Sequence, residues 1–283
     1  MEFLITVVAI HFAKPLMHKC GIMGKDLHKI GKPSLPESMG MVASFVFLSF
    51  LEPCPAFWCS LWGLWIGSLD DIFDLRWRTK LAMTAVTGLL LQPNTTVRVL
   101  SVNLGAFYHA YVGLWCIWCG NAINIHAGIN GLEVGQCLVI AVGLGCHRQH
   151  QSLTSYIAVC VGLLVHNWYP ASVFVGDSWC YMSGMFFVAY AMHNTETLAI
   201  IMLPQICNTL VSLPELVGVC PRHRMPLYDP KSDKLAPSDS WTLMNLTLRL
   251  CGPMREQTLC VTMLVLQAMC VCLSLFMEFS SQS

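Results

Sequence analysis

The sequence predicts an all-α integral membrane protein, a multi-span helical bundle of about ten transmembrane helices. Hydrophobic residues make up 55% of the 283-residue chain and charged residues only 11%, whereas soluble domains carry about 25% charged residues. The mean hydropathy of +0.58 agrees with this. The length would suit one or two soluble domains, but the apolar excess favours a single membrane-embedded domain over residues 1–283.

Ten apolar runs follow one another along the chain, and each is expected to form a helix. A spanning helix needs about 20 apolar residues. Several runs are shorter, so polar residues that face the bundle interior would extend them. The run 81–92 gives the weakest signal. The runs are 2–20, 39–52, 56–69, 81–92, 104–124, 133–147, 153–167, 178–193, 197–213 and 258–278.

Lysine and arginine predict how these helices are oriented, because basic loops stay on the cytosolic side. Five loops would share one side if all ten runs cross the bilayer: 21–38, 71–80, 125–132, 168–177 and 214–257. With Lys14 and Lys19 counted there, 14 of the 16 Lys and Arg residues fall on that side, and only Arg98 and Arg148 fall opposite. That side is therefore predicted to be cytosolic. The loop 214–257 is read as an ordered part of the same domain.

Net charge and cysteine placement exclude two classes of function. The formal net charge is zero, so no basic field would attract nucleic acid. Many of the 15 cysteines lie inside apolar runs, where a thiol behaves as a small hydrophobic side chain. Cys116 and Cys119 form a C-x-x-C pair, but no second pair or histidine cluster completes a zinc site.

Five polar clusters fall on the predicted cytosolic face, and ionisable groups at membrane depth indicate function. The first runs from Asp70 to Lys80 and holds three carboxylates, Asp70, Asp71 and Asp74. Asp70 and Asp74 would share a helix face. A divalent cation or a lysine would relieve their mutual repulsion. A solvated helix end with basic neighbours explains this stretch equally well.

The second and third clusters have structural alternatives too. Amides and glycines interrupt the apolar pattern between Asn121 and Glu133. Asn can ligate a hard cation and Gly lets a ligand approach the backbone, but both also favour helix caps and turns. Asp177 follows Phe174 and precedes an apolar run. In isolation, Asp177 is better read as a helix cap and Phe174 as a core residue.

The last two clusters are basic. The segment Cys220–Pro226 contains Arg222, His223 and Arg224. Arginine suits bidentate phosphate recognition, although a juxtamembrane basic patch that contacts lipid head groups has the same composition. The segment Lys25–Ser38 carries three lysines that could act only as topology determinants. All five clusters together supply the acids, amides, aromatic ring and arginines needed for magnesium-assisted phosphoryl transfer.

Taken together, these segments resemble the polyprenyl-phosphate N-acetylhexosamine-1-phosphate transferase family. The resemblance is closest to the eukaryotic branch, which acts on dolichyl phosphate. Arg222-His223-Arg224 replaces the histidine-rich motif of the bacterial branch, which favours UDP-N-acetylglucosamine as donor. The stretches that carry the resemblance lie in family order: KDLHK, LPESMG, DDIFDLRWRTKL, NAINIHAGINGLEVGQ, HNWYPASVFVGDSWCYMSGM, SLPELVGVCPRHRMP and LMNLTLRLCGPMREQTL.

The resemblance implies a catalytic centre with magnesium as its cofactor. Asn124 and Asp177 would ligate Mg²⁺ bound to the donor pyrophosphate. Lys80 would hold the lipid phosphate, with Asp70 and Asp71 beside it. A helix segment would wall the groove for dolichyl phosphate, and its residues are Ile117, Trp118, Cys119, Gly120, Asn121, Ala122, Ile123, Asn124 and Ile125.

The resemblance also implies a binding site for UDP-N-acetylglucosamine. Phe174 would stack on uracil, and Asn130 with the Leu27 region would enclose the uridine. Glu37 and Arg222 would hold the nucleotide-sugar end. Within the loop 214–257, read as the sugar-recognition loop, His223 and Arg224 would surround the N-acetyl sugar together with Trp77. The full set is Lys25, Asp26, Leu27, Glu37, Trp77, Asn130, Phe174, Arg222, His223 and Arg224.

The function implied is transfer of N-acetylglucosamine-1-phosphate to dolichyl phosphate with release of UMP, the first step of lipid-linked oligosaccharide synthesis for N-glycosylation. The implied setting is the endoplasmic reticulum membrane, multi-pass, with the site on the cytosolic face and a homodimer as assembly. Two other classes compete. A transporter would place its charges near the bilayer midplane, and an inactive relative would act as a scaffold. Compared with the eukaryotic branch, the luminal loops are reduced and the insertion after the CPRHR stretch is nearly absent.

Overall fold

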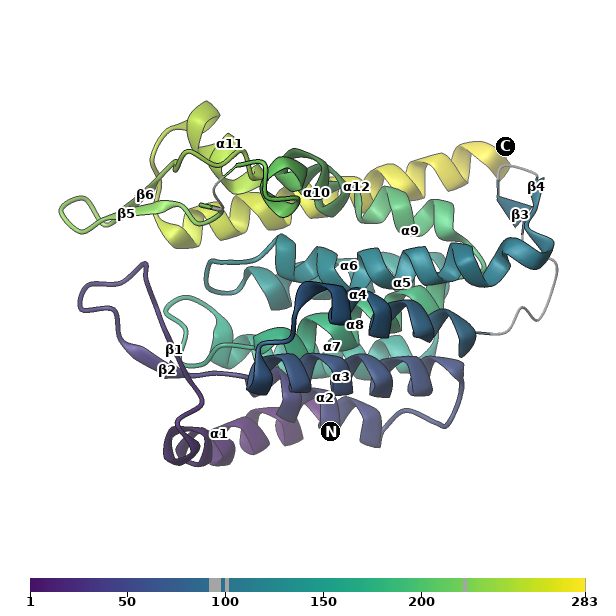
Figure 1. The fold of residues 1–283 in the computed structure, drawn as a ribbon, viewed down its shortest axis with the longest axis horizontal. Helices are drawn as coiled ribbons and strands as arrows, with labels where there is room; N and C mark the ends of the chain where they lie inside the picture. The colour runs from purple at the N-terminus through teal and green to yellow at the C-terminus, as the bar shows by residue number, and fades with distance from the viewer. Residues whose placement is uncertain (92–97, 100–101, 221–222, 283) are drawn as a thin grey trace.

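The protein is an elongated bundle of helices with three short β-hairpins (Figure 1). The structure is a computed structural model and describes residues 1–282 except 92–97, 100–101 and 221–222. Its α-helices are α1 Glu2–Cys20, α2 Met39–Ser49, α3 Pro55–Phe73, α4 Trp77–Val86, α5 Tyr108–Ile125, α6 Leu132–His147, α7 Gln151–Asn167, α8 Gly176–Ala191, α9 Thr195–Ile201, α10 Leu203–Leu216, α11 Leu243–Cys251 and α12 Glu256–Gln282. Two 3-10 turns are η1 Thr87–Leu89 and η2 Gly105–Phe107.

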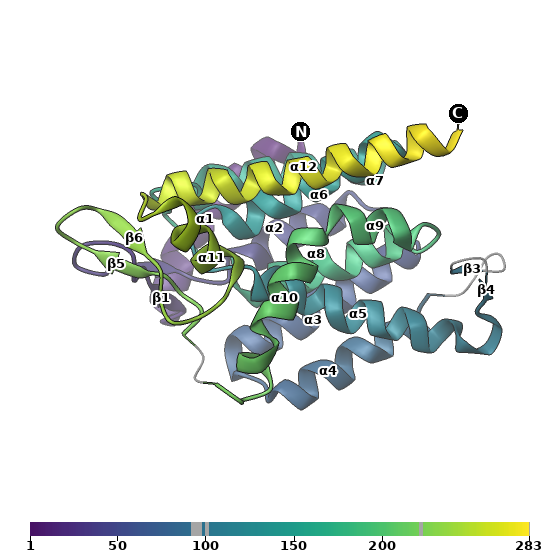
Figure 2. The same cartoon turned by 90° about the horizontal axis from the view of Figure 1, so that it is seen from above.

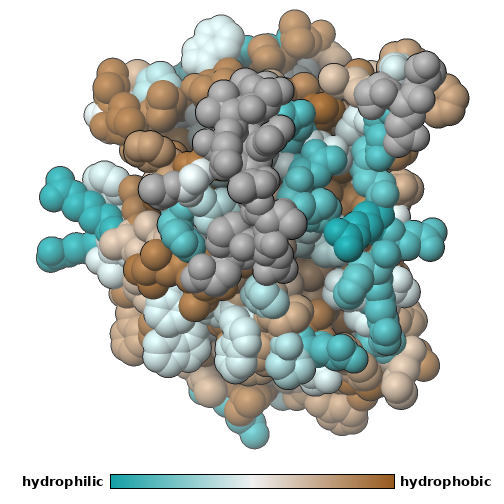
Figure 3. Space-filling view, turned by 90° about the vertical axis from the view of Figure 1, so that its right-hand side faces the viewer, coloured by the Kyte–Doolittle hydropathy of each residue, from teal (hydrophilic) through white to brown (hydrophobic). Residues whose placement is uncertain are grey.

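The three hairpins are antiparallel two-stranded pairs. They are β1 Met23–Lys25 with β2 Ser34–Pro36, β3 Arg98–Val99 with β4 Val102–Asn103, and β5 Leu227–Asp229 with β6 Lys234–Ala236. Two views show the long helices running roughly side by side, with the β1–β2 and β5–β6 hairpins at one end and β3–β4 and the C-terminus at the other (Figures 1 and 2). We call the first the hairpin end. The opposite end carries hydrophilic residues, with hydrophobic ones around much of its edge (Figure 3).

Helices α3 and α8 pack closely at the centre of the bundle, because glycines on α3 allow it. A Cβ atom at Gly63 would lie 2.6 Å from the Tyr181 carbonyl oxygen, and one at Gly67 would lie 2.4 Å from the Asp177 carbonyl oxygen. Small residues let helix backbones approach in this way. The close packing brings the end of α3, which carries Asp70 and Asp71, against the first turn of α8.

The core fills the middle of the bundle with large apolar side chains. Trp179, Tyr156 and Phe186 are fully buried, and the Tyr156 ring stacks on both of the others. A second, smaller cluster at the hairpin end joins α11, α12 and β6 through residues such as Leu235, Met244 and Leu259. Because this cluster ties the segment after α10 to the start of α12, the described part of the polar stretch 220–257 packs on the bundle. The fifteen cysteines are free thiols.

The apolar runs coincide with helices, and three features differ from the expectation. The run 197–213 forms two helices, α9 and α10, with a 71° bend. Pro204 lies in the first turn of α10, where proline is tolerated but cannot continue a preceding helix. The run 81–92 forms a helix that starts earlier, at Trp77. The hairpins and α11 were not expected, because short strands and a nine-residue helix leave little periodic signal.

Length and apolarity mark few of these helices as membrane spans on their own. Among the described residues, α1 and Glu256–Ser280 of α12 are long and apolar enough to cross a membrane, and the bent α9–α10 pair makes a third if it counts as one span. The fold is thus a mostly helical protein with apolar helices that fit a membrane. The number of ten spans remains a prediction.

Candidate active site

The end of α3 and the start of α4 bring a lysine onto two carboxylates. Helix α3 stops where Asp74 adopts a left-handed conformation with φ 46°, and α4 begins at Trp77. Lys80, in the first turns of α4, thereby returns to α3, and its Nζ lies 2.5 Å from Asp70 Oδ2 and 4.0 Å from Asp177 Oδ2. The lysine expected to hold the lipid phosphate therefore bridges two of the expected catalytic acids.

Asp71 stabilises the start of α8 from the neighbouring helix. Its Oδ1 accepts a hydrogen bond from the Asp177 backbone N–H at 2.7 Å, and its Oδ2 accepts one from Ser178 at 3.2 Å. These N–H groups have no partner within their own helix. The reading of Asp177 as the cap of α8 is wrong, because the helix begins earlier and Asp177 lies inside its first turn. Its side chain is left available for chemistry.

The two expected magnesium ligands are in direct contact. Asn124, near the end of α5, donates from Nδ2 to Asp177 Oδ1 at 2.5 Å. Arg224 approaches from the loop after α10 and donates to the Asn124 carbonyl oxygen at 3.0 Å and to its Oδ1 at 3.4 Å. Residues from three distant segments therefore meet within a few ångströms.

This donor set fits a magnesium ion that also contacts substrate phosphates. Mg²⁺ prefers oxygen ligands and is usually held by one or two side chains together with phosphate oxygens and waters. Asp177 supplies a carboxylate and Asn124 an amide oxygen, and Asp70 and Asp71 add negative charge beside them. Lys80 offsets part of that charge. A divalent cation would offset the remainder.

A small cavity of about 200 Å³ opens beside this cluster. Most of the residues expected to bind the donor line it, together with the expected magnesium ligands Asn124 and Asp177. The donor residues are Lys25, Asp26, Leu27, Glu37, Asn130, Phe174 and Arg224. Phe174 is half-buried and lines this cavity, so it is not a core residue. The Phe174 backbone N–H donates a hydrogen bond to the Pro36 carbonyl oxygen at 2.8 Å, and the Phe174 carbonyl oxygen accepts one from the Met39 N–H at 3.0 Å. Burial and the nearby Asp71 carboxylate raise the pKa of Glu37.

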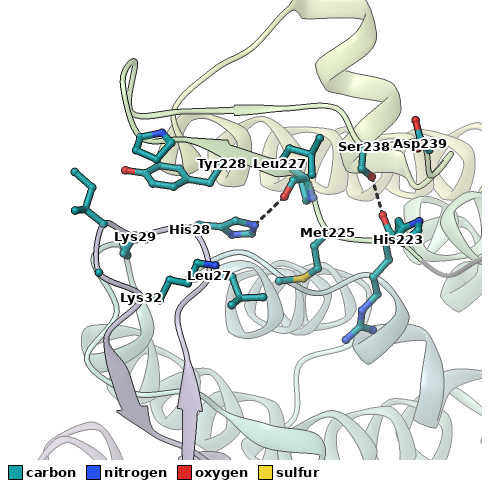
Figure 4. Close-up of a pocket in the computed structure, with 15 residues that line it drawn as sticks. Leu27, His28, Lys29, Lys32, His223, Met225, Leu227, Tyr228, Ser238 and Asp239 are labelled. Atoms are coloured by element: carbon teal, nitrogen blue, oxygen red, sulfur yellow. Dashed lines mark hydrogen bonds between the residues drawn. The ribbon is translucent and has the colours of Figure 1, made fainter.

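A larger cavity of about 990 Å³ adjoins the first and shares Leu27, His28, Arg224 and Met225 with it. Its walls are the β1–β2 loop on one side and the segment 223–239 on the other (Figure 4). His223, expected at the sugar, lines this cavity. His28 reaches across it and donates from Nε2 to the Pro226 carbonyl oxygen at 3.2 Å (Figure 4). The two cavities adjoin at these shared residues, and we refer to them together as the cleft.

One of the expected donor residues, Trp77, does not line this cleft, and another lies outside the part of the chain that the structure describes. Trp77 stands at the start of α4 with 65% of its side chain exposed, and it is not among the residues that line either cavity. Arg222 lies outside the described residues. Of the residues that this loop was expected to contribute to sugar binding, His223 and Arg224 are therefore the two that line the cleft.

The segment expected to wall the lipid groove is the second half of α5. Its polar side chains are anchored on other helices: Tyr181 donates from its hydroxyl to Asn121 Oδ1 at 2.8 Å, and Trp118 donates from Nε1 to Thr209 at 3.3 Å. Cys119, Gly120, Ala122 and Ile123 face the interior and are buried. Asn124, near the end of this segment, contacts Asp177 and Arg224.

Sequence reasoning missed two acidic residues of this region. Glu133 lines the small cavity, and Glu256 accepts from the Asn130 backbone N–H at 2.7 Å. Each is a lone acid at the start of an apolar helix, α6 and α12. An acid in that position usually complements a helix dipole, so neither gave a functional signal.

Comparison with known proteins agrees with this arrangement. Residues 55–195 match the family described as "Glycosyl transferase family 4". The chain is 33% identical to the UDP-N-acetylglucosamine--dolichyl-phosphate N-acetylglucosaminephosphotransferase of Dictyostelium discoideum, and the match covers 95% of this chain and 84% of that protein. The chain belongs to glycosyl transferase family 4. The matched region runs from the start of α3 into α9 and includes Asp70, Asp71, Lys80, Asn124 and Asp177.

Other relatives in this family carry the same or related names. The chain is 30% identical to the protein of the same name in Saccharomyces cerevisiae, over 88% of this chain and 82% of that protein. It is 27% identical to a phospho-N-acetylmuramoyl-pentapeptide-transferase of Kosmotoga olearia, over 69% of this chain and 74% of that protein. The alignments to the first two relatives extend over 344 and 369 positions. Both alignments are longer than the 283 residues of this chain. They therefore contain gaps in this chain, which lacks segments that the two relatives have.

Proposed function

We propose that this protein transfers N-acetylglucosamine-1-phosphate from UDP-N-acetylglucosamine to dolichyl phosphate, giving N-acetylglucosaminyl-diphosphodolichol and UMP. The observation that carries the proposal is the convergence of Lys80, Asn124, Asp177 and Arg224 beside the cleft. These residues come from four segments, and they bring together the charges that transfer of a phosphoryl group requires. The relatives with the highest identities here carry the name of this activity.

The reaction is a single in-line displacement. An oxygen of the dolichyl phosphate attacks the β-phosphorus of the donor, and the bond from that phosphorus to the bridging oxygen breaks. UMP leaves with the electron pair. A phosphate monoester is largely dianionic near neutral pH, and UMP leaves as a dianion, so the charges balance without a proton transfer. Asp70 and Asp177 hold the Lys80 ammonium beside the attacking phosphate, where it offsets negative charge.

Magnesium, held by Asn124 and Asp177, would bind the donor pyrophosphate and neutralise charge on its oxygens. Arg224 and His223 would contact the sugar side of the donor, Phe174 would stack on the uracil, and Asn130 and Leu27 would enclose the uridine. Glu37 would face the ribose and the sugar end. Each of these side chains lines the cleft.

A covalent route through Asp70 or Asp71 is the alternative mechanism. The contacts of both residues favour the direct route. Both oxygens of Asp71 accept hydrogen bonds from the start of α8, and Asp70 is paired with Lys80 and accepts from the Leu75 backbone N–H at 2.9 Å. A nucleophilic carboxylate would have to give up these partners.

The setting belongs to the same proposal. The chain would form one polytopic domain of about ten spans in the endoplasmic reticulum membrane, with the hairpin end on the cytosolic face, where a soluble nucleotide sugar can enter. The long acceptor tail would remain in lipid beside the second half of α5. The segment 214–257 would act as the sugar-recognition loop. Assembly as a homodimer is a further expectation from the family.

The test is an assay of the purified protein in detergent with magnesium, UDP-[¹⁴C]N-acetylglucosamine and dolichyl phosphate. A labelled lipid product that requires magnesium and disappears with tunicamycin is expected. No lipid product with the wild-type protein under these conditions, or a product only with a muramyl-pentapeptide donor, would refute the proposed activity.

A further inference from the structure

A buried ionic network lies behind the donor cleft, around a residue that the proposed reaction does not use. Glu256 in the first turn of α12 is 4% exposed. Its Oε1 accepts from the Asn130 backbone N–H at 2.7 Å and lies 3.8 Å from His28 Nδ1. Its Oε2 is ion-paired with the Lys29 ammonium. One carboxylate therefore contacts both the β1–β2 loop and the turn between α5 and α6.

Asp26 closes the network on its other side. It is 3% exposed, and its Oδ2 lies 3.4 Å from the Lys29 ammonium and accepts from Asn130 Nδ2 at 3.4 Å. Its Oδ1 accepts from the His28 backbone N–H at 3.2 Å. Lys29 also lies over the ring of Tyr169 at 4.4 Å. The ammonium is thus enclosed by two carboxylates and an aromatic face.

A metal ion is the obvious alternative for this cluster. Asp26, His28 and Glu256 offer ligand atoms that all lie within 4.8 Å of one another. Lys29, however, already lies in this cluster: its ammonium pairs with both carboxylates and offsets one of their two negative charges. We therefore interpret the cluster as an internal ion pair network rather than as a second metal site.

The network joins three segments that form the walls of the cleft. Through Lys29 and His28 it holds the β1–β2 loop, and through the Asn130 N–H it holds the turn at 128–131. His28 extends it to the Pro226 carbonyl oxygen across the larger cavity (Figure 4). Asn130 is further fixed because its Oδ1 accepts from the Ala171 backbone N–H at 3.0 Å, in the segment that leads to Phe174.

We propose that Glu256 is a positioning residue for donor binding: from the start of α12 it fixes the loop of Leu27 and the turn of Asn130 at the separation that the uridine requires. The inference rests on the proposed function. Glu256 itself does not line either cavity, so it acts through Asn130, His28 and Lys29. Loss of its charge should loosen the nucleotide end of the cleft and leave the catalytic cluster around Asp177 in place.

The decisive variant is Glu256→Gln, which keeps the size of the side chain and one acceptor oxygen but removes the charge that pairs with Lys29. The KM for UDP-N-acetylglucosamine should rise about tenfold. The kcat and the KM for dolichyl phosphate should stay within about twofold of wild type, because the groups that react are untouched. UMP should bind more weakly in calorimetry by a similar factor.

Glu278→Gln is the matched control. Glu278 lies near the C-terminal end of the same helix and is also paired with a histidine, His147. That end of α12 lies away from the hairpin end (Figure 2). The Glu278→Gln variant should have the same KM for UDP-N-acetylglucosamine and the same affinity for UMP as wild type. A purely structural role for Glu256 would reduce the amount of folded enzyme and its melting temperature without separating donor KM from kcat.

If Glu256→Gln does not yield folded protein, Glu256→Asp provides the same test, because it keeps the charge but withdraws the carboxylate by one methylene. It should show a smaller rise in donor KM at unchanged kcat. Unchanged donor KM and UMP affinity in a folded variant, or an equal loss for both substrates, would overturn the positioning role. An inactive wild-type protein would instead refute the proposed function, so the two failures are distinct.

Discussion

Asp177 is the residue at which the contacts of the candidate site meet. Its side chain contacts Asn124 and lies 4.0 Å from Lys80, and its backbone N–H is held by Asp71. Three helices therefore determine where one carboxylate lies. We propose that Asp177 and Asn124 bind magnesium, that Lys80 binds the lipid phosphate and that Arg224 binds the sugar.

The first prediction concerns the metal role of Asp177. Asp177→Ala should lower kcat by about 10³-fold or more, because the carboxylate that would hold the cation is removed. The magnesium concentration for half-maximal activity should also increase in any residual activity. Steady-state assays over a magnesium titration measure both. Asp229→Ala, at an exposed acid on the β5–β6 hairpin, should behave as wild type, and near-normal activity of Asp177→Ala would remove its metal role.

The second prediction concerns sugar recognition by Arg224. Arg224→Ala should reduce kcat/KM for UDP-N-acetylglucosamine about 10- to 100-fold, because charged hydrogen bonds near the sugar and to the Asn124 carbonyl are lost. The control is Arg255→Ala, an exposed arginine one residue before Glu256, which should leave kcat/KM unchanged. Equal kinetics of the two variants would exclude Arg224 from the site.

The motifs predicted which residues meet in the candidate site better than they predicted what holds those residues in place. The family resemblance implied that Asn124 and Asp177 ligate one ion, and their side chains are in contact. The sequence did not predict that Asp71 accepts hydrogen bonds from the start of α8. A hydrogen bond from one helix to the backbone of another leaves no pattern in the sequence. Glu256 gave no signal for the same reason: its partners are more than a hundred residues away.

At the scale of elements, the contact between α3 and α8 brings the acids together. Gly67 on α3 lies against the backbone of Asp177 and Ser178, and Asp70 and Asp71 follow it within about one turn. The sequence predicted both helices from their apolar runs. It did not predict that they are neighbours, because helix pairing in a bundle depends on three-dimensional packing rather than on local periodicity.

The third prediction tests this contact. Gly67→Ala would place a Cβ 2.4 Å from the Asp177 carbonyl oxygen. The helices would have to separate, at a cost of about 1–3 kcal/mol, and the melting temperature in detergent should fall by several degrees together with turnover. Gly145→Ala on α6 is the control, because its Cβ would meet nothing closer than 3.9 Å. Equal melting temperatures for the two variants would contradict the packing described for α3 and α8.

The elements that the sequence missed are short and lie in segments that were read as loops. The β1–β2 and β5–β6 hairpins and α11 are short, and they are held by packing on the bundle and by the network around Glu256. They nevertheless form the rim of the cleft, so a reading of apolar runs alone would have placed the site at helix ends only. The break between α9 and α10 was missed because Pro204 lies inside an otherwise continuous apolar run.

At the scale of the whole molecule, the residues of the proposed reaction gather at one end of the bundle, which we propose faces one side of the membrane. The β1–β2 and β5–β6 hairpins, the cleft and the acids share the hairpin end, whereas Arg148 and His193 lie in a small cavity lined also by Glu278 near the end of α12. This separation agrees with the charge bias of the loops. The fold class was predicted from composition, but the number of spans was not established by helix length.

The fourth prediction tests this orientation. A protease site inserted at Pro230–Asp233, in the exposed turn of the β5–β6 hairpin, should be cleaved in intact microsomes by protease added outside, since the hairpin end is expected to face the cytosol. A site at Gln149, in the loop between α6 and α7, should be cleaved only after the membrane is permeabilised. Protection of the hairpin site in sealed vesicles would reverse the proposed topology.

The central claim is that phosphorus moves together with the sugar, directly between the two substrates. UDP-N-acetylglucosamine labelled with ³²P at the β-phosphate, given to purified protein with magnesium and dolichyl phosphate, measures this most directly. The account predicts that the label appears in the lipid product, that unlabelled UMP is released in equal amount and that the protein stays unlabelled when the lipid is omitted. Label released as UDP, or label bound to the protein without the lipid acceptor, would contradict it.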